Sequence, residues 1–361
     1  MRKKQIAIDC RMVNSSGIGV YIKNLIPLCI TALPQTAFTL IGPANLATQL
    51  QLPHQESLRY VQAQAPIYSL REQLEISKIV SGLDALWVPH YTIPLLTSVP
   101  LAVTVHDVAH LALPSVFGPA KRVYAKCMLS AVKYKAKALF FDSAFTSQEF
   151  SSYIGNPRGV SVITPLGVSP EWFQHGQTTS PFPWPYIIAV GNLKPHKNLL
   201  ALCHAFARLV QTHPHHLVLV GKKEGFRTGF QETNLETLAP GRIHCVGEQS
   251  FFSLRTMVHN AAWLIFPSIY EGFGFPPLEA LASGTQVLAA DIPPVRETCG
   301  DRICYFDPTS ENNLYEALHT ALLQPPPPEK ACRGRRYAEG FTWEKTSEII
   351  TQTLKKTFGL Y

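Results

Sequence analysis

The stretch WLIFPSIYEGFGFPPLEALASGTQVLAAD, residues 263–291, carries the pattern that decides the fold. Its unbroken apolar start predicts a buried strand, and the loop that follows contains Gly272 and Gly274, which let the backbone approach a ligand without a Cβ in the way. The two prolines then predict the first turn of a helix, where a missing N–H costs little, and Gly284 is suited to end that helix. A second apolar run closes the stretch. Strand, helix and strand in this order predict a parallel β-α-β unit.

Two glutamates flank the glycines and prolines of this loop. Glu271 precedes the predicted helix, and Glu279 is expected in its first turn, so both carboxylates are expected near the helix N-terminus. The amides and the partial positive charge of a helix N-terminus suit a phosphate. A carboxylate there can accept hydrogen bonds from vicinal hydroxyls, as on a ribose. The alternative is a structural role, in which Glu279 complements the helix dipole.

Apolar runs alternate with segments of helical period along the rest of the chain, in two series split by the proline-rich stretch at 178–185. The runs lie at 6–9, 38–41, 58–61, 85–88, 101–105, 138–141 and 160–163, and then at 186–190, 217–220, 243–246, 263–266, 285–290 and 303–306. This alternation predicts an α/β fold with two Rossmann-like, doubly wound domains, at 1–168 and 183–340. A last helix, at 341–361, is expected to pack back toward the first domain. Because such sheets bind ligands at the carboxyl ends of their strands, the cleft between the domains is the expected site.

The composition is that of a folded chain. Of the 361 residues, 46% are hydrophobic and 16% are charged, which excludes a disordered polymer. No apolar run reaches the roughly 18 residues that a membrane-spanning helix needs, and Asp9 interrupts the short apolar start, which favours a first strand over a signal peptide. The eight cysteines form no CxxC pair. They favour reduced thiols in a cytoplasmic protein over disulfides or a zinc site.

The excess positive charge lies in the first half of the chain. Residues 1–165 contain 15 Lys and Arg against 8 Asp and Glu, whereas residues 166–361 contain 17 of each. Six of the basic residues, and no acidic one, fall in the segment 121–137. This segment is either a solvated helix face or a surface that docks on anionic lipid or on a phosphorylated partner. Nucleic acid is a weaker option, because no aromatic side chains are interleaved with the basic ones in the way that stacking on bases requires.

The stretch at 267–291 resembles the E-x7-E signature of retaining GT-B glycosyltransferases of family 4, the glycosyl transferases group 1, with Glu271 and Glu279 on its two glutamates. IAIDCRMVNSSGIGVYIKNL is similar to the family's first strand, Gly-rich loop and helix, and VTVHDVAHLALPSVF to its HD segment. VGNLKPHKNLLALCHAF is similar to the opening of its donor domain, and FTWEK to the start of its closing helix. The resemblance therefore covers nearly the whole chain. It implies a GT-B fold, in which the first domain binds the acceptor and the second binds a nucleotide-diphosphate sugar.

The resemblance also implies roles for residues of the second domain. Glu279 is implied to bind the ribose hydroxyls and Glu271 the sugar hydroxyls, while Lys197 neutralises the diphosphate, whose developing charge needs a fixed cation. The implied donor site is completed, largely through backbone groups, by Gly191, Asn192, His196, Val246, Gly272, Phe273, Gly274 and Phe275.

Two positions depart from the family pattern. Many members have arginine where this chain has Asn192 and His196. A second cation for the diphosphate would then come from Lys194 or from Arg11 in the first domain.

In the first domain, the resemblance singles out residues that follow two strands. His106 is implied to hydrogen-bond the donor sugar or the acceptor, and Asp107 follows it in the HD segment. Gly17 and Gly19 open the first helix and are implied to contact phosphate or acceptor. Taken alone, the GxG pattern is a weak signal.

The expected reaction is transfer of a hexose to a hydroxyl with retention of the anomeric configuration. No DxD motif is present, so no metal or other cofactor is expected. GDP-mannose is the first expectation for the donor, and a saccharide or lipid-linked acceptor of cell-surface polysaccharide synthesis is expected, with peripheral membrane contact through 119–137 and no nucleic acid partner. The alternatives are a GT-B-shaped binding or scaffold subunit without turnover, and a nucleotide-sugar epimerase.

Overall fold

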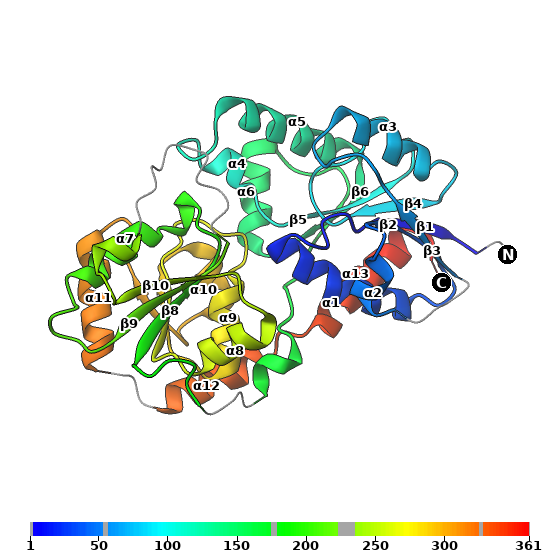
Figure 1. Cartoon of the computed structure of the whole chain (residues 1–361). Helices are drawn as coiled ribbons and strands as arrows, with labels where there is room; N and C mark the ends of the chain where they lie inside the picture. The colour runs from blue at the N-terminus through cyan, green and yellow to red at the C-terminus, as the bar shows by residue number, and fades with distance from the viewer. Residues whose placement is uncertain (1–2, 53–56, 175–178, 223–234, 325–327, 361) are drawn as a thin grey trace. The chain divides into compact units, whose positions relative to one another are not determined.

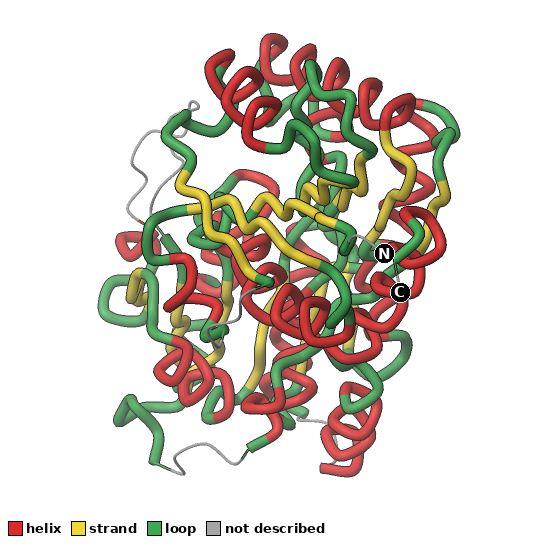
Figure 2. Tube along the Cα trace, turned by 90° about the vertical axis from the view of Figure 1, so that its right-hand side faces the viewer, coloured by secondary structure: helices red, strands yellow, loops and turns green. Residues whose placement is uncertain are grey.

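The chain folds into two compact units. The computed structural model describes residues 3–52, 57–174, 179–222, 235–324 and 328–360. The first unit comprises Met1–Gly167 together with Thr342–Tyr361, and the second comprises Val168–Phe341. Figure 2 shows the strands of both units enclosed by helices.

A seven-stranded parallel sheet forms the centre of the first unit, in the order β3-β2-β1-β4-β5-β6-β7. Its strands are β1 (Gln5–Asp9), β2 (Ala37–Gly42), β3 (Leu58–Gln62), β4 (Ala85–Val88), β5 (Leu101–Val105), β6 (Ala136–Phe141) and β7 (Val160–Ile163). Strands β4 and β5 are buried along their whole length, as their unbroken apolar sequences predict.

Helices cover both faces of this sheet. They are α1 (Ser16–Ala32), α2 (Leu46–Leu50), α3 (Leu70–Ile79), α4 (Ala109–Ala112), α5 (Pro119–Lys135), α6 (Ala144–Ile154) and α13 (Trp343–Phe358). In Figure 1, α3 and α5 lie on one face and α1, α2 and α13 on the other. The closing helix α13 packs against α1, and the Trp343 ring contacts that of Tyr21 at 6.2 Å between centroids.

A six-stranded parallel sheet forms the second unit, in the order β10-β9-β8-β11-β12-β13. Its strands are β8 (Tyr186–Val190), β9 (His216–Val220), β10 (Ile243–Gly247), β11 (Trp263–Phe266), β12 (Val287–Ala290) and β13 (Cys304–Phe306). Its helices are α7 (Leu199–Ala207), α8 (Phe251–His259), α9 (Phe275–Ser283), α10 (Pro293–Cys299), α11 (Glu311–Leu323) and α12 (Pro328–Ala338), with the 3-10 turns η1 (Pro170–Phe173), η2 (Pro195–Lys197) and η3 (Leu235–Leu238). The prediction of two doubly wound parallel sheets is thus confirmed.

The division between the units falls at Val168, ahead of the proline-rich stretch at 178–185, of which residue 178 lies outside the described residues. The sequence pattern predicted that the second domain starts at residue 183. In the structure, η1 packs against α9, and the Trp172 side chain is buried there. This apolar anchor places the start of the second unit fifteen residues earlier.

No helix among the described residues is long and apolar enough to cross a bilayer. The eight cysteines are all free thiols. Four of them, at positions 10, 29, 203 and 299, are buried.

Candidate active site

The order of the second sheet places a crevice between β8 and β11. These two strands are adjacent and parallel, but the chain leaves β8 toward β9 on one side of the sheet and leaves β11 toward β12 on the other. Loops that part in this way open a ligand site at the carboxyl ends of the strands. The loop after β8 runs through Gly191 and Asn192 to Lys197, and the loop after β11 contains Glu271.

An ion pair joins these two loops. Lys197 Nζ lies 2.5 Å from Glu271 Oε1, and the two side chains are 19% and 16% exposed. The Lys197 ammonium also lies 5.8 Å from the centroid of the Phe266 ring. The structure therefore brings together, from positions 74 residues apart, the two charged groups that the sequence analysis placed at the diphosphate and at the sugar.

Backbone bonds hold the two loops against each other. The Ile269 amide donates to the carbonyl of His196 at 2.9 Å. The His196 side chain is buried, and the carbonyl of the same residue anchors the loop after β11. Asn192 is half-buried beside Gly191, directly after β8.

The start of α9 depends on one glycine. Gly274 caps the helix with φ +103°, a conformation that side chains rarely adopt, and a Cβ there would lie 3.3 Å from a methyl of Val295. The buried Thr298 hydroxyl lies 2.9 Å from the Phe273 carbonyl and 2.8 Å from that of Pro294, so its one hydrogen is shared between the glycine loop and α10. The helix ends at Gly284 in the left-handed conformation, as predicted.

Glu279 lies on the second turn of α9, not the first. The helix begins at Phe275 rather than at the prolines, so Glu279 is its fifth residue and there is no acidic residue in its first turn. A role in complementing the dipole at the helix start is therefore weaker than the sequence suggested, because that effect fades within one turn.

The carboxyl of Glu279 has an unusual environment. Burial raises its pKa to about 7, and a hydrogen bond from the Trp172 indole offsets part of this rise. Trp172 comes from η1, which is distant in sequence, so spacing alone could not reveal it. Near pH 7 this carboxyl therefore has two forms: the ionised form only accepts hydrogen bonds, whereas the protonated form can also donate one.

The backbone around Val246 is irregular. The register of β10 against β9 shifts between Cys245 and Gly247, so Val246 lies on a bulge. The Cys245 amide donates to Glu236 Oε1 at 3.0 Å, and the Val246 carbonyl accepts from Gln249 Nε2 at 2.7 Å. These bonds fix the backbone at Val246, which the family resemblance implies to be part of the donor site.

In the first unit, His106 follows β5 and is held on both sides of its ring. Nδ1 lies 2.6 Å from Asp142 Oδ2, and Nε2 lies 3.0 Å from the Pro89 carbonyl oxygen. Burial alone would lower the pKa of His106, but the Asp142 carboxylate and the Pro89 carbonyl raise it above its usual value. Asp142 directly follows β6, the neighbour of β5, which is the signal that could have predicted this pair.

Of three other predicted residues of the first unit, Asp107 and Gly19 have local structural partners and Gly17 has none within reach of a Cβ. The Asp107 carboxylate accepts from the Ala109 amide at 2.9 Å, at the start of α4. Gly19 faces the Val13 carbonyl, which a Cβ would approach to 2.5 Å, whereas a Cβ on the exposed Gly17 would meet nothing within 4 Å. Close packing thus accounts for Gly19 and leaves Gly17 accessible.

Arg11 is not available as a second cation for a phosphate. Its guanidinium pairs with Asp9, with Nη2 at 2.6 Å from Oδ2, and lies 3.5 Å from Glu72 Oε1. Lys194, the other candidate, is exposed on the loop after β8. Over the part of the chain that the structure describes, no group of three or more His, Cys, Asp or Glu side chains is arranged to hold a metal ion.

Comparisons with known proteins agree with this geometry. Residues 171–339, nearly all of the second unit, match the model of the family described as glycosyl transferases group 1. The chain is 26% identical over 271 residues to the O-antigen chain mannosyltransferase RfbU of Salmonella typhimurium, covering 74% of this chain and 72% of the relative. It is also 26% identical over 271 residues to the O-antigen chain mannosyltransferase B of Escherichia coli, covering 70% and 68%.

A solved structure shows the same fold over the whole chain. Sucrose-phosphate synthase from Thermosynechococcus elongatus superposes with a TM-score of 0.79 at 18% identity, and the match covers 99% of this chain and 100% of that one. The fold class expected from the sequence is therefore confirmed.

Proposed function

We propose that this chain, whose residues 171–339 match the family described as glycosyl transferases group 1, is a hexosyltransferase that moves the hexose of a nucleotide-diphosphate sugar to an acceptor hydroxyl with retention of the anomeric configuration. The observation that carries this proposal is the pair of Lys197 and Glu271, 2.5 Å apart at the switch point of the second sheet. A cation and a carboxylate so placed match the two ends of a sugar diphosphate.

Binding of the donor would exchange the partners of this pair. The Lys197 ammonium would turn from Glu271 to the diphosphate oxygens and stabilise the negative charge that develops as the sugar–phosphate bond breaks. Glu271, released from the lysine, would accept hydrogen bonds from the sugar hydroxyls. The bond between the anomeric carbon and the acceptor oxygen forms on the same face, and the acceptor's proton passes to the leaving phosphate oxygen.

Glu279 is proposed to bind the ribose. Its two oxygens can accept from the vicinal hydroxyls when the carboxyl is ionised, and the Trp172 indole orients it. No metal is required in this proposal, because Lys197 and the backbone of Gly272–Phe275 are expected to balance the diphosphate charge. Undiminished transfer in the presence of EDTA is the expected result.

Mannose is the proposed sugar and GDP-mannose the first donor to test. Two relatives similar over more than two thirds of their length are named O-antigen chain mannosyltransferases. By this similarity we propose a role in cell-surface polysaccharide synthesis at the cytoplasmic face of the membrane, with a saccharide or lipid-linked acceptor bound by the first unit.

Membrane contact is proposed through α5. Two basic side chains of this helix are already engaged within their own unit and are less available to a membrane. Lys133 donates a hydrogen bond to the Ile154 carbonyl at 2.9 Å. Lys135 donates to the carbonyls of Leu95 and Thr97. Three exposed basic residues remain at the start of the helix: Lys121, Arg122 and Lys126. Replacing these three with alanine is expected to lower flotation with phosphatidylglycerol vesicles, and the triple variant Lys345/Lys355/Lys356→Ala on α13 is the matched control.

The direct test is a calorimetric titration with GDP, UDP and dTDP and their sugars, followed by turnover of the preferred donor. Preference for GDP with consumption of GDP-mannose is expected. Preference for another nucleotide would replace mannose as the sugar, and tight binding without turnover against a panel of acceptors would favour a binding subunit over an enzyme.

A further inference from the structure

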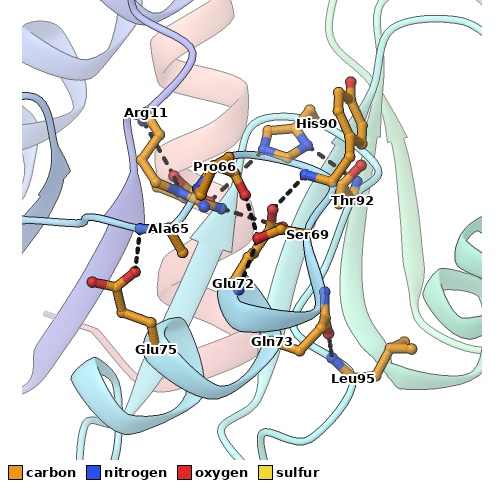
Figure 3. Close-up of polar contacts among 12 residues, drawn as sticks. Arg11, Ala65, Pro66, Ser69, Glu72, Gln73, Glu75, His90, Thr92 and Leu95 are labelled. Carbon is orange, nitrogen blue, oxygen red and sulfur yellow. Dashed lines mark hydrogen bonds and ion pairs between the residues drawn. The ribbon is translucent and has the colours of Figure 1, made fainter.

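The loop between β3 and α3 in the first unit, residues 63–69, is held rigidly by two glutamates of α3 (Figure 3). Glu75 Oε2 accepts from the Ala65 amide at 2.6 Å. Glu72 Oε2 accepts from the Tyr68 amide, also at 2.6 Å. The loop lies at the carboxyl edge of the sheet, the side on which open α/β folds bind ligands.

A buried chain of charges ties Glu72 to the sheet itself. The Glu72 side chain is 1% exposed and lies 3.5 Å from Arg11 Nη2, and Arg11 in turn pairs with Asp9 at the end of β1. His90, after β4, lies 3.8 Å from Asp9 on the other side. Burial alone would raise the pKa of Asp9, but the hydrogen bonds and the charge of Arg11 hold it well below its usual range. The carboxylates and the guanidinium thus form a fixed support between β1, β4 and α3.

This support presents Tyr68 to solvent in a strained backbone conformation. Tyr68 has φ +68°, a region that non-glycine residues seldom occupy and that is costly unless its surroundings impose it. Its side chain is 56% exposed, and its ring lies 5.9 Å from that of Tyr124 on α5, in an edge-to-face arrangement. A rigid, exposed aromatic ring held at an energetic cost indicates a binding role.

Polar groups surround the ring. Burial and the nearby carboxylates of Glu72 and Asp107 raise the pKa of Tyr68, and the Tyr124 ring beside it carries a second hydroxyl. An apolar ring face rimmed by hydroxyl and charged groups matches a pyranose, which presents a C–H face and an edge of hydroxyls.

We propose that Tyr68 is an acceptor-binding residue, whose ring is the platform for a pyranose ring of the acceptor saccharide, and that Glu72 is the positioning residue that holds it. This inference rests on the proposed function, since it names the acceptor side of the same reaction. A lipid surface is the competing occupant, because Leu70 and Leu74 on α3 are 89% and 65% exposed. The polar rim favours the saccharide, since a lipid would leave it unmatched.

The test uses the full chain and three trisaccharide probes: α-mannotriose, maltotriose and N,N′,N″-triacetylchitotriose. Saturation-transfer NMR of the wild-type protein is expected to show binding of at least one probe. Tyr68→Ala is expected to weaken that binding at least tenfold and to leave nucleotide affinity and donor hydrolysis by water within twofold of wild type. Tyr153→Ala, which removes another exposed tyrosine of the same unit, is the matched control and should change neither.

A second variant separates binding from folding. Tyr68→Gly removes the ring and also relieves the left-handed strain, so its Tm is expected to stay near that of wild type while saccharide binding is lost as in Tyr68→Ala. A merely structural tyrosine would lower Tm in both variants and leave saccharide binding intact.

Three outcomes would overturn the inference. The first is absence of binding of all three probes by the wild-type protein. The second is unchanged saccharide binding in Tyr68→Ala. The third is loss of binding to phosphatidylglycerol vesicles in that variant with saccharide binding intact, which would assign the ring to a lipid surface. Failure of the proposed function itself is recognised separately, as absence of nucleotide binding and donor consumption by the wild-type protein.

Discussion

His106 and Asp142 form a partly buried pair in the first unit, with 2.6 Å between Nδ1 and Oδ2. The carbonyl of Pro89 can only accept, so Nε2 carries a hydrogen, and a second hydrogen lies between Nδ1 and the carboxylate. A histidine bonded in this way serves as a fixed donor or a positive charge. It cannot act as a general base without first giving up one of these partners.

Replacing Asp142 with asparagine is expected to lower the pKa of His106, since the charge that raises it is removed. A raised histidine pKa contributes stability that is fully present below the unfolded value of about 6.5 and is lost as pH rises through the folded value. The difference in free energy of unfolding between wild type and Asp142→Asn should therefore be larger at pH 6 than at pH 9. Denaturant titrations at both pH values measure the difference in free energy of unfolding, and an NMR titration of the His106 ring measures the change in its pKa. Asp301→Asn, at a side chain that is 93% exposed, is the control, and an equal difference at both pH values would contradict the pairing.

Glu279→Gln is expected to separate stability from nucleotide binding. Folding raises the pKa of this carboxyl from 4.5 to about 7, so the free energy of unfolding falls as pH rises between these values. Glutamine cannot ionise, so the variant should gain stability relative to wild type on going from pH 5 to pH 8. Its affinity for the preferred nucleotide should fall about tenfold or more, because a charged hydrogen bond to the ribose contributes about 1.5–3 kcal/mol. Denaturant and calorimetric titrations measure both, and the exposed Glu316→Gln on α11 is the control.

The fold was predictable because its signals are local. Unbroken apolar strands separated by helical segments define each sheet, and the glycine and proline pattern after β11 locates α9. The error on Glu279 came from a helix that starts one residue earlier, at Phe275, because Gly274 adopts the left-handed conformation.

The parts of the candidate sites that the sequence did not reveal join residues from separate loops. Glu279 meets Trp172, His106 meets Asp142, and Arg11 meets Glu72 only after the strands have paired. Of these, only Asp142 had a usable signal, since it directly follows a predicted strand. The exposure and strain of Tyr68 depend on bonds from α3 that no spacing rule encodes.

Lys197→Met is expected to reduce kcat at least a hundredfold, in the range seen when a preorganised group that stabilises developing charge is removed. Stability should change little, by about 1 kcal/mol or less, because the pair with Glu271 is partly exposed and such pairs contribute little. Steady-state kinetics and thermal unfolding measure the two effects. Lys194→Met, on the same loop and exposed, is the matched control, and it also tests whether Lys194 supplies a second cation. Equal losses in the two variants would assign the diphosphate charge to the loop as a whole.

The two glycines at the start of α1 are expected to respond differently to the same substitution. A Cβ on Gly19 would lie 2.5 Å from the Val13 carbonyl oxygen, so Gly19→Ala forces the backbone apart and should destabilise the protein by about 1–3 kcal/mol. Gly17→Ala meets nothing within 4 Å and should preserve or raise stability, because alanine favours a helix over glycine by up to about 1 kcal/mol. The family resemblance implies that Gly17 contacts a bound phosphate or the acceptor. If it does, the Gly17→Ala variant should have a higher KM for the acceptor and an unchanged Tm. Denaturant unfolding and acceptor kinetics on the two variants measure this, and a Gly17→Ala enzyme with unchanged KM would limit the role of this loop to packing.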